Sequence, residues 1–350
     1  MNTVVLDSGN SIVKSRKAGQ EDSYPHALVG LTSSEFDQIV ASHSKAAGGE
    51  TIPDGFALVN GAAYAYGEMA LRRGNVQRLQ GAARYTESYY GVLAAIALAR
   101  LSERSYDTML FASYSPRDAQ YGENLLDSVM REWNVKLADR EMRIGVEYGN
   151  TFSEPVGGLM NVLLTQDGRN YERPDIKDCN SLVIDIGGGT TDFQGVMPNG
   201  KLDYNVSLSV PLGINKIESD FESAVRQNNP ELFRTAFQVP PDRFRAAIRT
   251  GKFSGAGQQI SCENEVTEAS YLLLNQIRDA YQGKTGGRAV WDAIILTGGG
   301  SAMLFDRLVN DVLEHDRVIL ADSDITDLHM ANVRGGMKLW RFYEAAGMLQ

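Results

Sequence analysis

Two short segments place a carboxylate beside a glycine-bearing turn. One, SLVIDIGGGTTDF, lies in the middle of the chain and carries Asp185 just before three consecutive glycines. The other, TVVLDSGNSIVKS, lies near the start of the chain and carries Asp7. With the two acids aligned, Gly9 falls on Gly187, and both segments consist of an apolar run, an Asp, a turn and a second β-prone run. This repetition indicates that the two turns serve one kind of chemistry.

Glycine turns of this kind expose successive backbone N–H groups, which together form a concave site for an anion. A carboxylate beside that site repels a phosphate unless a divalent cation, or water held by one, lies between them. The paired segments therefore predict a clamp for a magnesium-bound nucleotide. Lys14 adds a positive charge near the first turn, and Thr190 and Thr191 add hydroxyl donors near the second. The alternative is that both segments are tight β-hairpins with a polar tip and no ligand.

A third glycine turn, LTGGGS, follows an apolar strand expected at 293–296 and precedes a helical pattern. The first N–H groups of such a helix could hold phosphate or ribose oxygens. Two further motifs do not support a site. GKTGG resembles the end of a P-loop, but the residue at the first glycine position is Arg278. DSDITD, at 322–327, has calcium-like spacing but lacks the required glycine and glutamate. Both are expected to be solvated loops.

The elements that must position these turns alternate between strand and helix, which predicts an α/β fold. Strands are expected at 3–6, 12–16, 106–114, 142–152, 181–186, 293–296 and 317–322. Helices are expected at 86–103, 119–134, 154–166, 265–282 and 331–349, and the region 212–257 is mostly helical in pattern. The chain thus consists of two hairpin-led α/β halves joined by one helix, which suggests an internal duplication.

Composition limits the possible functions. The 350 residues carry 34 basic and 44 acidic side chains, a formal net charge of −10, which argues against direct nucleic-acid binding. Cys179 and Cys262 lie far apart and are expected to be reduced core thiols. The most apolar run, GVLAAIALARL, is too short to span a membrane and is expected to form a buried helix. With no signal-peptide pattern visible, we expect a cytoplasmic protein.

Four motifs in order resemble those of one superfamily. LDSGNSIVK, EPVGGLMNVL, DIGGGTTDF and LTGGGS resemble the phosphate-1, connect-1, phosphate-2 and adenosine motifs of the actin, sugar-kinase and heat-shock-chaperone ATPases. Within that superfamily, RYTESYYGVLAAIALARL and ANVRGGMKLW resemble the ParM-like prokaryotic actins, which include plasmid-segregation and archaeal members. The resemblance implies a two-domain actin-like fold with the nucleotide in the cleft between the domains. Domain I would comprise 1–157 and 331–350, and domain II would comprise 158–330.

The resemblance also implies roles for individual residues. Asp7 and Asp185 would hold Mg²⁺ through water, and Glu154 would orient the water that attacks ATP. Catalysis would thus rest on Glu154 and Asp185. Nucleotide binding would rest on the three turns and one lysine: Ser8, Gly9, Asn10, Ser11, Lys14, Gly187, Gly188, Gly189, Thr190, Thr191, Gly298, Gly299 and Gly300. Lys216 and Glu218 are either nucleoside contacts or surface charges.

The chain departs from the chaperone pattern at one place. Chaperones of the superfamily usually have alanines where this chain has Gly157 and Gly158.

The function that the resemblance implies is an ATPase that binds Mg-ATP, assembles into filaments and hydrolyses ATP, with DNA reached through an adaptor protein. The alternatives are a small-molecule kinase of the same fold, which needs a general base aimed at a substrate hydroxyl, and a nucleotide sensor that does not polymerise.

Overall fold

The computed structural model describes residues 2–47, 51–73, 88–233, 241–255, 257–285, 291–313 and 315–349. Its strands are β1 (Asn2–Ser8), β2 (Ile12–Lys17), β3 (Gln20–Pro25), β4 (Leu28–Leu31), β5 (Phe56–Val59), β6 (Ala62–Tyr66), β7 (Tyr106–Tyr114), β8 (Glu132–Leu137), β9 (Arg140–Ser153), β10 (Ser181–Ile186), β11 (Thr191–Val196), β12 (Leu202–Val210), β13 (Lys252–Gly255), β14 (Gln258–Ser261), β15 (Ala293–Thr297) and β16 (Val318–Leu320). Its α-helices are α1 (Ser33–Ala47), α2 (Gly67–Arg72), α4 (Ser88–Arg100), α5 (Gly122–Val129), α6 (Glu154–Leu163), α7 (Pro174–Lys177), α8 (Ile214–Asn228), α9 (Pro241–Thr250), α10 (Glu263–Thr285), α11 (Gly299–Arg307) and α12 (Ala331–Ala345). Shorter helical segments are η1 (Pro116–Tyr121), η2 (Pro198–Gly200), η3 (Pro230–Phe233), η4 (Leu308–Leu313) and η5 (Ile325–Met330).

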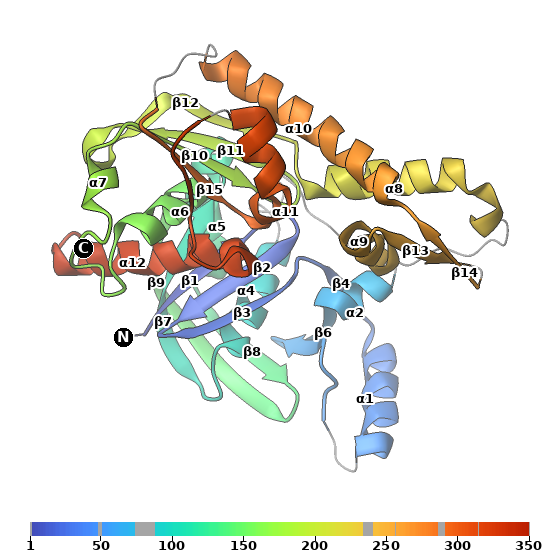
Figure 1. Cartoon of the computed structure of the whole chain (residues 1–350). Helices are drawn as coiled ribbons and strands as arrows, with labels where there is room; N and C mark the ends of the chain where they lie inside the picture. Colours follow the sequence, from blue (N-terminus) through green and yellow to red (C-terminus); the bar gives the residue numbers. More distant parts are fainter. Residues whose placement is uncertain are drawn as a thin grey trace.

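The strands form two large sheets that repeat one arrangement (Figure 1). The first sheet has the order β3-β2-β1-β7-β9-β8-β5-β6-β4, and β1 pairs antiparallel with β2 and parallel with β7. The second has the order β12-β11-β10-β15-β16, and β10 pairs antiparallel with β11 and parallel with β15. Each Asp–Gly hairpin therefore occupies the same place in its own sheet, as expected from an internal duplication.

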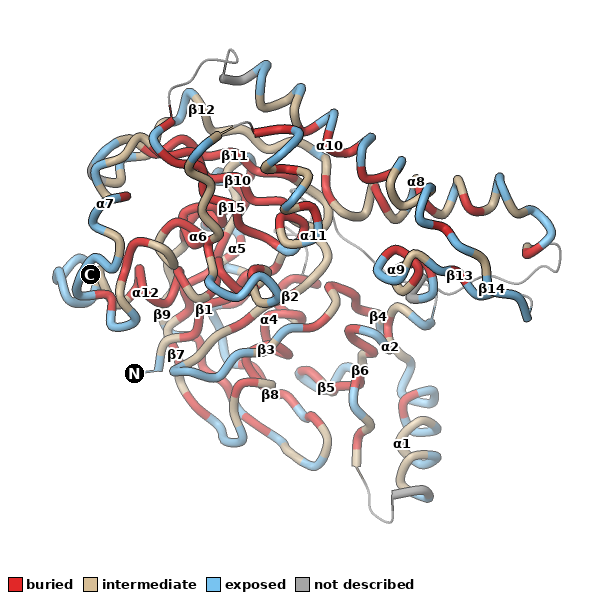
Figure 2. The backbone as a smooth tube through the Cα atoms, in the orientation of Figure 1, coloured by how far each residue is buried: buried red, intermediate tan, exposed pale blue. Residues whose placement is uncertain are grey.

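Each sheet has its own apolar core. Helix α4 packs on the first sheet and is buried from Leu93 to Ala99, which confirms the buried helix expected from its apolar run (Figure 2). On the second sheet, α8 and α10 contribute Phe221 and Leu273 to a cluster with Ile184 of β10. None of the helices in the described ranges has the length and apolar character needed to cross a membrane.

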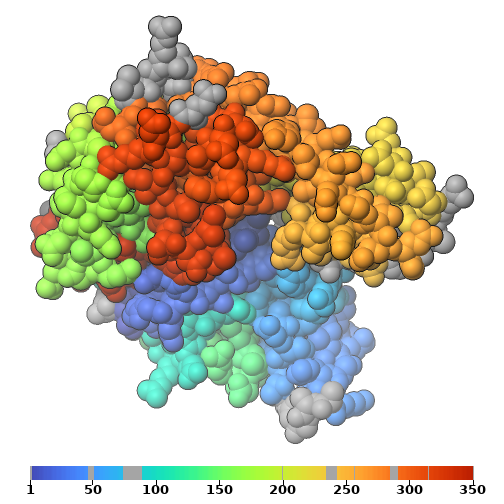
Figure 3. All heavy atoms as spheres, viewed as in Figure 1, coloured from blue at the N-terminus to red at the C-terminus, as the bar shows by residue number. Residues whose placement is uncertain are grey.

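Helices α6 and α12 lie between the two halves. Leu159 of α6 packs with Val183 of the second sheet. Trp340 of α12 packs with Phe111 of the first sheet, with ring centroids 5.4 Å apart. In the space-filling view the N-terminal residues gather below and most residues from the middle of the chain onward gather above (Figure 3). The division into 1–157 with 331–350 and 158–330 stays a prediction.

An ion-pair network also joins the halves. Arg334 of α12 donates to Glu21 of β3 at 2.7 Å, to Asp322 at 2.8 Å and to Asp327 at 2.7 Å. The planar guanidinium can bind several carboxylates at once. The segment DSDITD, expected to be a solvated loop, is therefore part of this network. GKTGG also differs from expectation, because residues 283–285 belong to the end of α10, while 286 and 287 lie outside the described residues.

Three other expectations need correction. The helix expected at 119–134 ends at Val129, because Trp133, Val135 and Leu137 alternate with exposed residues and form the buried face of β8. The described part of the region 212–257 is mostly helical, as expected, through α8, η3 and α9, but it ends in β13, which forms a hairpin with β14. Both cysteines are free, but only Cys262 is buried in the core. The start of the helix expected at 86–103 lies outside the described residues.

Candidate functional site

The two glycine turns lie in direct contact, although they belong to different sheets. A Cβ atom added to Gly188 would overlap Ser11 Oγ. One added to Gly189 would lie 3.0 Å from Cβ of Asn10. Only residues without side chains allow the second turn to approach the first this closely. The structure thus brings together the two turns that the sequence places far apart.

Two aspartates and a lysine lie at the base of these turns. Asp7 of β1 faces Lys14 of β2 across the hairpin, and Lys14 Nζ donates to Asp7 Oδ2 at 2.6 Å. Asp7 is fully buried, and 11% of the Lys14 side chain is exposed. Burial lowers the pKa of Lys14, but the carboxylates of Asp7, Asp185 and Glu154 raise it, and the net pKa lies above its usual value. Lys14 is therefore a cation held among three carboxylates.

Asp185 is held by a residue from α12. It is 4% exposed, and Asn332 Nδ2 donates to Asp185 Oδ2 at 2.7 Å. Burial raises the pKa of Asp185 and the charge of Asp7 adds to this, while Lys14 and the Asn332 hydrogen bond oppose it without cancelling it. The carboxylate is therefore held in a position where its charge is unfavourable without a further cation.

The third glycine turn closes over Asp185. Gly298 has a φ of 85°, and a Cβ there would overlap both Asp185 Oδ1 and the carbonyl oxygen of Ile186. Gly300 packs equally tightly on Ile186, whereas Gly299 has only His329 Cβ nearby, at 3.5 Å. The turn thus requires glycine for its backbone conformation and its close packing, and α11 begins beside the metal carboxylate predicted from the sequence.

The carbonyl groups of the second turn face α8. Backbone N–H groups of Ile214 and Asn215 donate to the carbonyls of Gly187 and Gly188 at 3.1 and 2.8 Å. The side chain of Asn215 also accepts from Ser11 Oγ at 3.2 Å, which links α8 to the first turn. These hydrogen bonds hold the turn through its carbonyl oxygens. The protein's own contacts therefore fix the shape of the turn.

The threonines of this turn have different surroundings. Thr191 is fully buried, and its hydroxyl donates to the carbonyl of Leu212 at 2.6 Å. Thr190 accepts from the backbone N–H of Gly187 through its own carbonyl, at 2.9 Å. The hydroxyl of Thr191 therefore supports the turn, and its role in nucleotide binding stays a prediction.

Glu154 is the first residue of α6 and is buried. Three residues further along this helix, a Cβ on Gly157 would lie 2.6 Å from the carbonyl oxygen of Asn332, and a Cβ on Gly335 would overlap the carbonyl of Gly157. Gly158 meets the side chain of Thr297 in the same way. Gly157 and Gly335 therefore let α6 and α12 cross with their backbones in contact, and Gly158 lets α6 pack closely on β15.

Three residues at the site were not predicted from the sequence. Nδ1 of His26 lies 2.6 Å from the carbonyl oxygen of Gly9. Because a carbonyl can only accept, the histidine nitrogen is the donor. Ser115, after β7, donates to Asp192 at 3.0 Å and so joins the two halves. Asn332 belongs to the ANVRGG segment that carried the family resemblance, and no local spacing marks the other two.

Lys216 and Glu218 make ion pairs on α8 and α9. Lys216 Nζ donates to Asp220 at 2.8 Å, and Arg245 donates to Glu218 at 2.8 Å. Each charge is therefore neutralised by a neighbour in the second half. This arrangement favours the surface-charge interpretation, and a nucleoside contact by either residue stays a prediction.

The donor set fits a hydrated magnesium ion. No group of three or more His, Cys, Asp or Glu side chains in the described part of the chain is placed to bind a metal directly. Asp7 Oδ1, however, is buried and has no hydrogen-bond partner among the described residues. Because an unsatisfied buried carboxylate oxygen is costly, a partner such as metal-bound water would stabilise it. Magnesium keeps several waters and often binds through one or two carboxylates.

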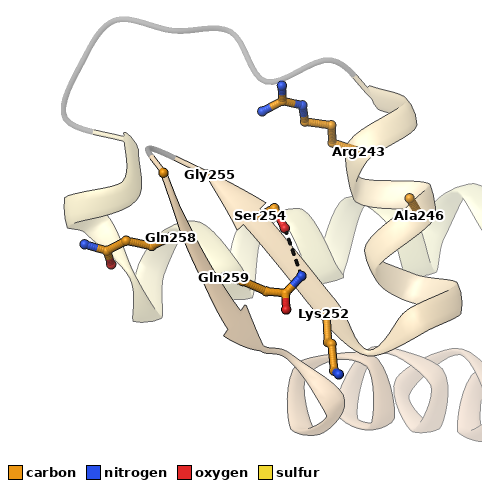
Figure 4. Close-up of a pocket in the computed structure, with 8 residues that line it drawn as sticks. Arg243, Ala246, Lys252, Ser254, Gly255, Gln258 and Gln259 are labelled. Carbon is orange, nitrogen blue, oxygen red and sulfur yellow. Dashed lines mark hydrogen bonds between the residues drawn. The ribbon is translucent and has the colours of Figure 1, made fainter.

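A separate cavity of about 520 Å³ lies beside α9 and the β13–β14 hairpin (Figure 4). Its described lining consists of Arg243, Ala246, Lys252, Ser254, Gly255, Gly257, Gln258 and Gln259. This lining has no carboxylate and none of the residues predicted for the site, and both of its cations are exposed. The cavity is therefore distinct from the clamp formed by the three turns.

Sequence comparison alone does not classify the chain: no protein-family model and no curated protein matches it. Solved structures match it from end to end. The archaeal actin homolog Ta0583 in its native form has a TM-score of 0.77 at 17% identity, covering 100% of both chains. Its complex with ADP has a TM-score of 0.74 at 17% identity, again over 100% of both chains. A 15-stranded ParM filament from Clostridium botulinum has a TM-score of 0.72 at 16% identity, covering 97% of this chain and 99% of that chain. The TM-scores establish the fold, and at identities this low they establish the fold alone: the chain has the two-domain actin-like fold of the ParM type.

Proposed function

We propose that this protein is an ATPase that binds Mg-ATP between its two halves, assembles with copies of itself and hydrolyses the nucleotide. One observation carries the proposal. The turns at Gly9 and at Gly187–Gly189 come from separate sheets, yet they meet above a buried cluster of Asp7, Lys14 and Asp185. A cluster with more carboxylates than cations, beside two anion-binding turns, suits a ligand that brings both phosphates and a divalent cation.

The chain's own groups divide the work of binding. Backbone N–H groups of the turns at Gly9 and Gly188 would hold the β- and γ-phosphates, as in other anion-binding turns. Lys14, now paired with Asp7 at 2.6 Å, would add a charge-assisted hydrogen bond to a phosphate oxygen. The N-terminus of α11, at Gly299, would face the nucleoside.

Asp7 and Asp185 would hold the magnesium ion through water. When bound, this ion supplies charge neutralisation of the phosphates. Two buried carboxylates beside a single lysine are suited to receive that positive charge, because Asp185 already has its pKa raised by burial.

Glu154 would orient the water that attacks the γ-phosphate. Its charge contributes to the raised pKa of Lys14, so it lies within electrostatic reach of the cluster, and it opens the helix that joins the halves. Phosphoryl transfer depends mainly on positioning and electrostatic stabilisation, so an oriented carboxylate beside the phosphates is sufficient for this role.

Self-assembly is proposed from the fold. One structure similar to this chain is described as a 15-stranded ParM filament, and another as an archaeal actin homolog in complex with ADP. We propose that this protein likewise forms filaments that depend on nucleotide. A role in DNA segregation would need a DNA-binding adaptor, since the net charge of −10 disfavours direct contact with DNA.

One paired assay tests this function. Phosphate release and sedimentation are measured on the same sample with Mg-ATP, with Mg-ADP and with ATP in EDTA. We expect Mg-ATP to be hydrolysed and to drive the protein into the pellet above a critical concentration, and ADP to do so poorly. Asp185→Ala should abolish hydrolysis. Hydrolysis without sedimentation, rising when a sugar or acid is added, would instead indicate a kinase.

A further inference from the structure

The position of the Asp185 carboxylate is set by a hydrogen-bond chain that crosses between the two halves. Asn332, the second residue of α12, is 2% exposed. Its Nδ2 donates to Asp185 Oδ2 at 2.7 Å, and its Oδ1 accepts from Thr297 Oγ1 at 3.0 Å. A carboxylate only accepts, so the amide nitrogen must face Asp185, and the Thr297 hydroxyl fixes that orientation.

This bond leaves the two oxygens of Asp185 with different surroundings. Oδ2 is occupied by Asn332, while Oδ1 points toward Gly298, where only a glycine leaves room for it. Within the described ranges, no hydrogen bond to Oδ1 is found. The oxygen left over for a metal-bound water is therefore determined by Asn332.

The backbone of the same residue lies at the crossing of the two joining helices. The carbonyl oxygen of Asn332 lies 2.6 Å from the position of a Cβ on Gly157, in the helix that begins with Glu154. Asp185 and Thr297 belong to neighbouring strands of the second sheet, where they are directly paired. Asn332 therefore holds the carboxylate from outside the sheet that carries it.

We propose that Asn332 is a positioning residue that directs Asp185 Oδ1 toward the magnesium ion of the nucleotide; this inference rests on the proposed function. Its loss should weaken the contribution of magnesium to ATP binding and leave magnesium-free binding nearly unchanged. Replacing a residue that orients a metal-binding carboxylate typically costs about 10- to 100-fold in metal affinity or activity.

The test compares the ATP dissociation constant in Mg²⁺ with that in EDTA, using the full chain and titration calorimetry. The ratio of the two constants is the magnesium increment. Asn332→Leu keeps a similar side-chain shape, removes the donor and leaves the Thr297 hydroxyl without its acceptor. The double variant Asn332→Leu with Thr297→Val removes both members of the Asn332–Thr297 hydrogen bond, which should recover the stability lost at the Thr297 hydroxyl, because replacing both members of a buried pair is nearly neutral. Asp185 Oδ2 loses its donor equally in both variants.

A matched control is available on the same helix. Lys338 is also buried on α12 and donates to the carbonyl of Asn161 at 2.6 Å, so Lys338→Met disturbs the helix pair without touching Asp185. We expect Lys338→Met to lower the melting temperature and to keep the wild-type magnesium increment. Both Asn332 variants should lose about 10- to 100-fold of the increment, and the double variant should do so although it is more stable than Asn332→Leu.

Two results would overturn the inference, and they differ from failure of the proposed function. A double variant with the wild-type increment would show that Asn332 serves stability alone. An equal loss in Lys338→Met would show that any damage to α12 has this effect. A wild-type protein with no magnesium increment at all would remove the proposed function, and the inference with it.

Discussion

Replacing Asp185 with Asn should make the nucleotide-free protein more stable while removing its magnesium-dependent ATP binding. Asp7, Asp185 and Glu154 all raise the pKa of Lys14, so this cluster contains three carboxylates and one ammonium group. Asp185→Asn reduces the formal charge of the cluster from −2 to −1. The new amide oxygen can still accept a hydrogen bond from Asn332. Stabilising single changes commonly contribute about 0.5–2 kcal/mol. In domains of this size that corresponds to roughly 2–4 °C per kcal/mol.

The pH dependence gives this prediction its sign. Burial raises the pKa of Asp185 above the ordinary value of 3.8. The folded chain therefore keeps this proton at pH values where the unfolded chain has released it, so stability falls as the pH rises through that window. The penalty is absent below the ordinary pKa and grows as the pH rises toward the raised one. The gap in melting temperature between Asp185→Asn and the wild type should then shrink as the pH falls toward 4.

Asp7→Asn is the matched control, because it should act in the opposite direction. Asp7 pairs directly with Lys14 at 2.6 Å, and removing one member of a buried ion pair costs about 3 kcal/mol or more. Thermal unfolding in EDTA, at several pH values, measures both variants. The reasoning is refuted if Asp185→Asn is less stable than the wild type at pH 7, or if its advantage persists unchanged in acid.

Three further changes have distinct expected outcomes. Glu154→Gln should bind ATP and assemble but hydrolyse about 10²- to 10⁴-fold more slowly, so that light scattering decays late; decay on the wild-type schedule would remove Glu154 from the mechanism. Gly335→Ala places a Cβ on the carbonyl of Gly157 and should cost about 1–3 kcal/mol in urea unfolding, whereas Gly283→Ala, with open space around it, should not destabilise the protein. Arg334→Gln should cost about 1–2 kcal/mol, and its deficit should narrow in high salt, because ions screen the three carboxylates it leaves behind.

Local pattern was sufficient to predict both hairpins and their order. Asp7 and Asp185 each precede a glycine turn, and apolar runs before them predict the buried strands β1 and β10. The resemblance to ParM-like actins then implied the fold, which the solved structures support. These features depend on residues close together in the sequence, where spacing determines structure directly.

Other features depend on contacts that no local pattern contains. Asn332 and Asp185 meet only because α12 returns to the ends of β10 and β15, and the bond of Ser115 to Asp192 likewise joins distant segments. The bond from the Thr191 hydroxyl to the carbonyl of Leu212 also joins residues 21 apart in the sequence. The end of α5 was placed too late, because alternation around Trp133 begins within an apparently helical run.

The central claim, that separate turns form one site for Mg-ATP, is tested most directly by hydrogen exchange. Amide exchange is measured by mass spectrometry on the full chain, with and without Mg-ATP, at concentrations below assembly. We predict that peptides covering 7–14, 185–191 and 298–301 all gain protection together, while the β13–β14 hairpin at 252–261 does not. Protection at one turn alone, or at the hairpin instead, would contradict the account.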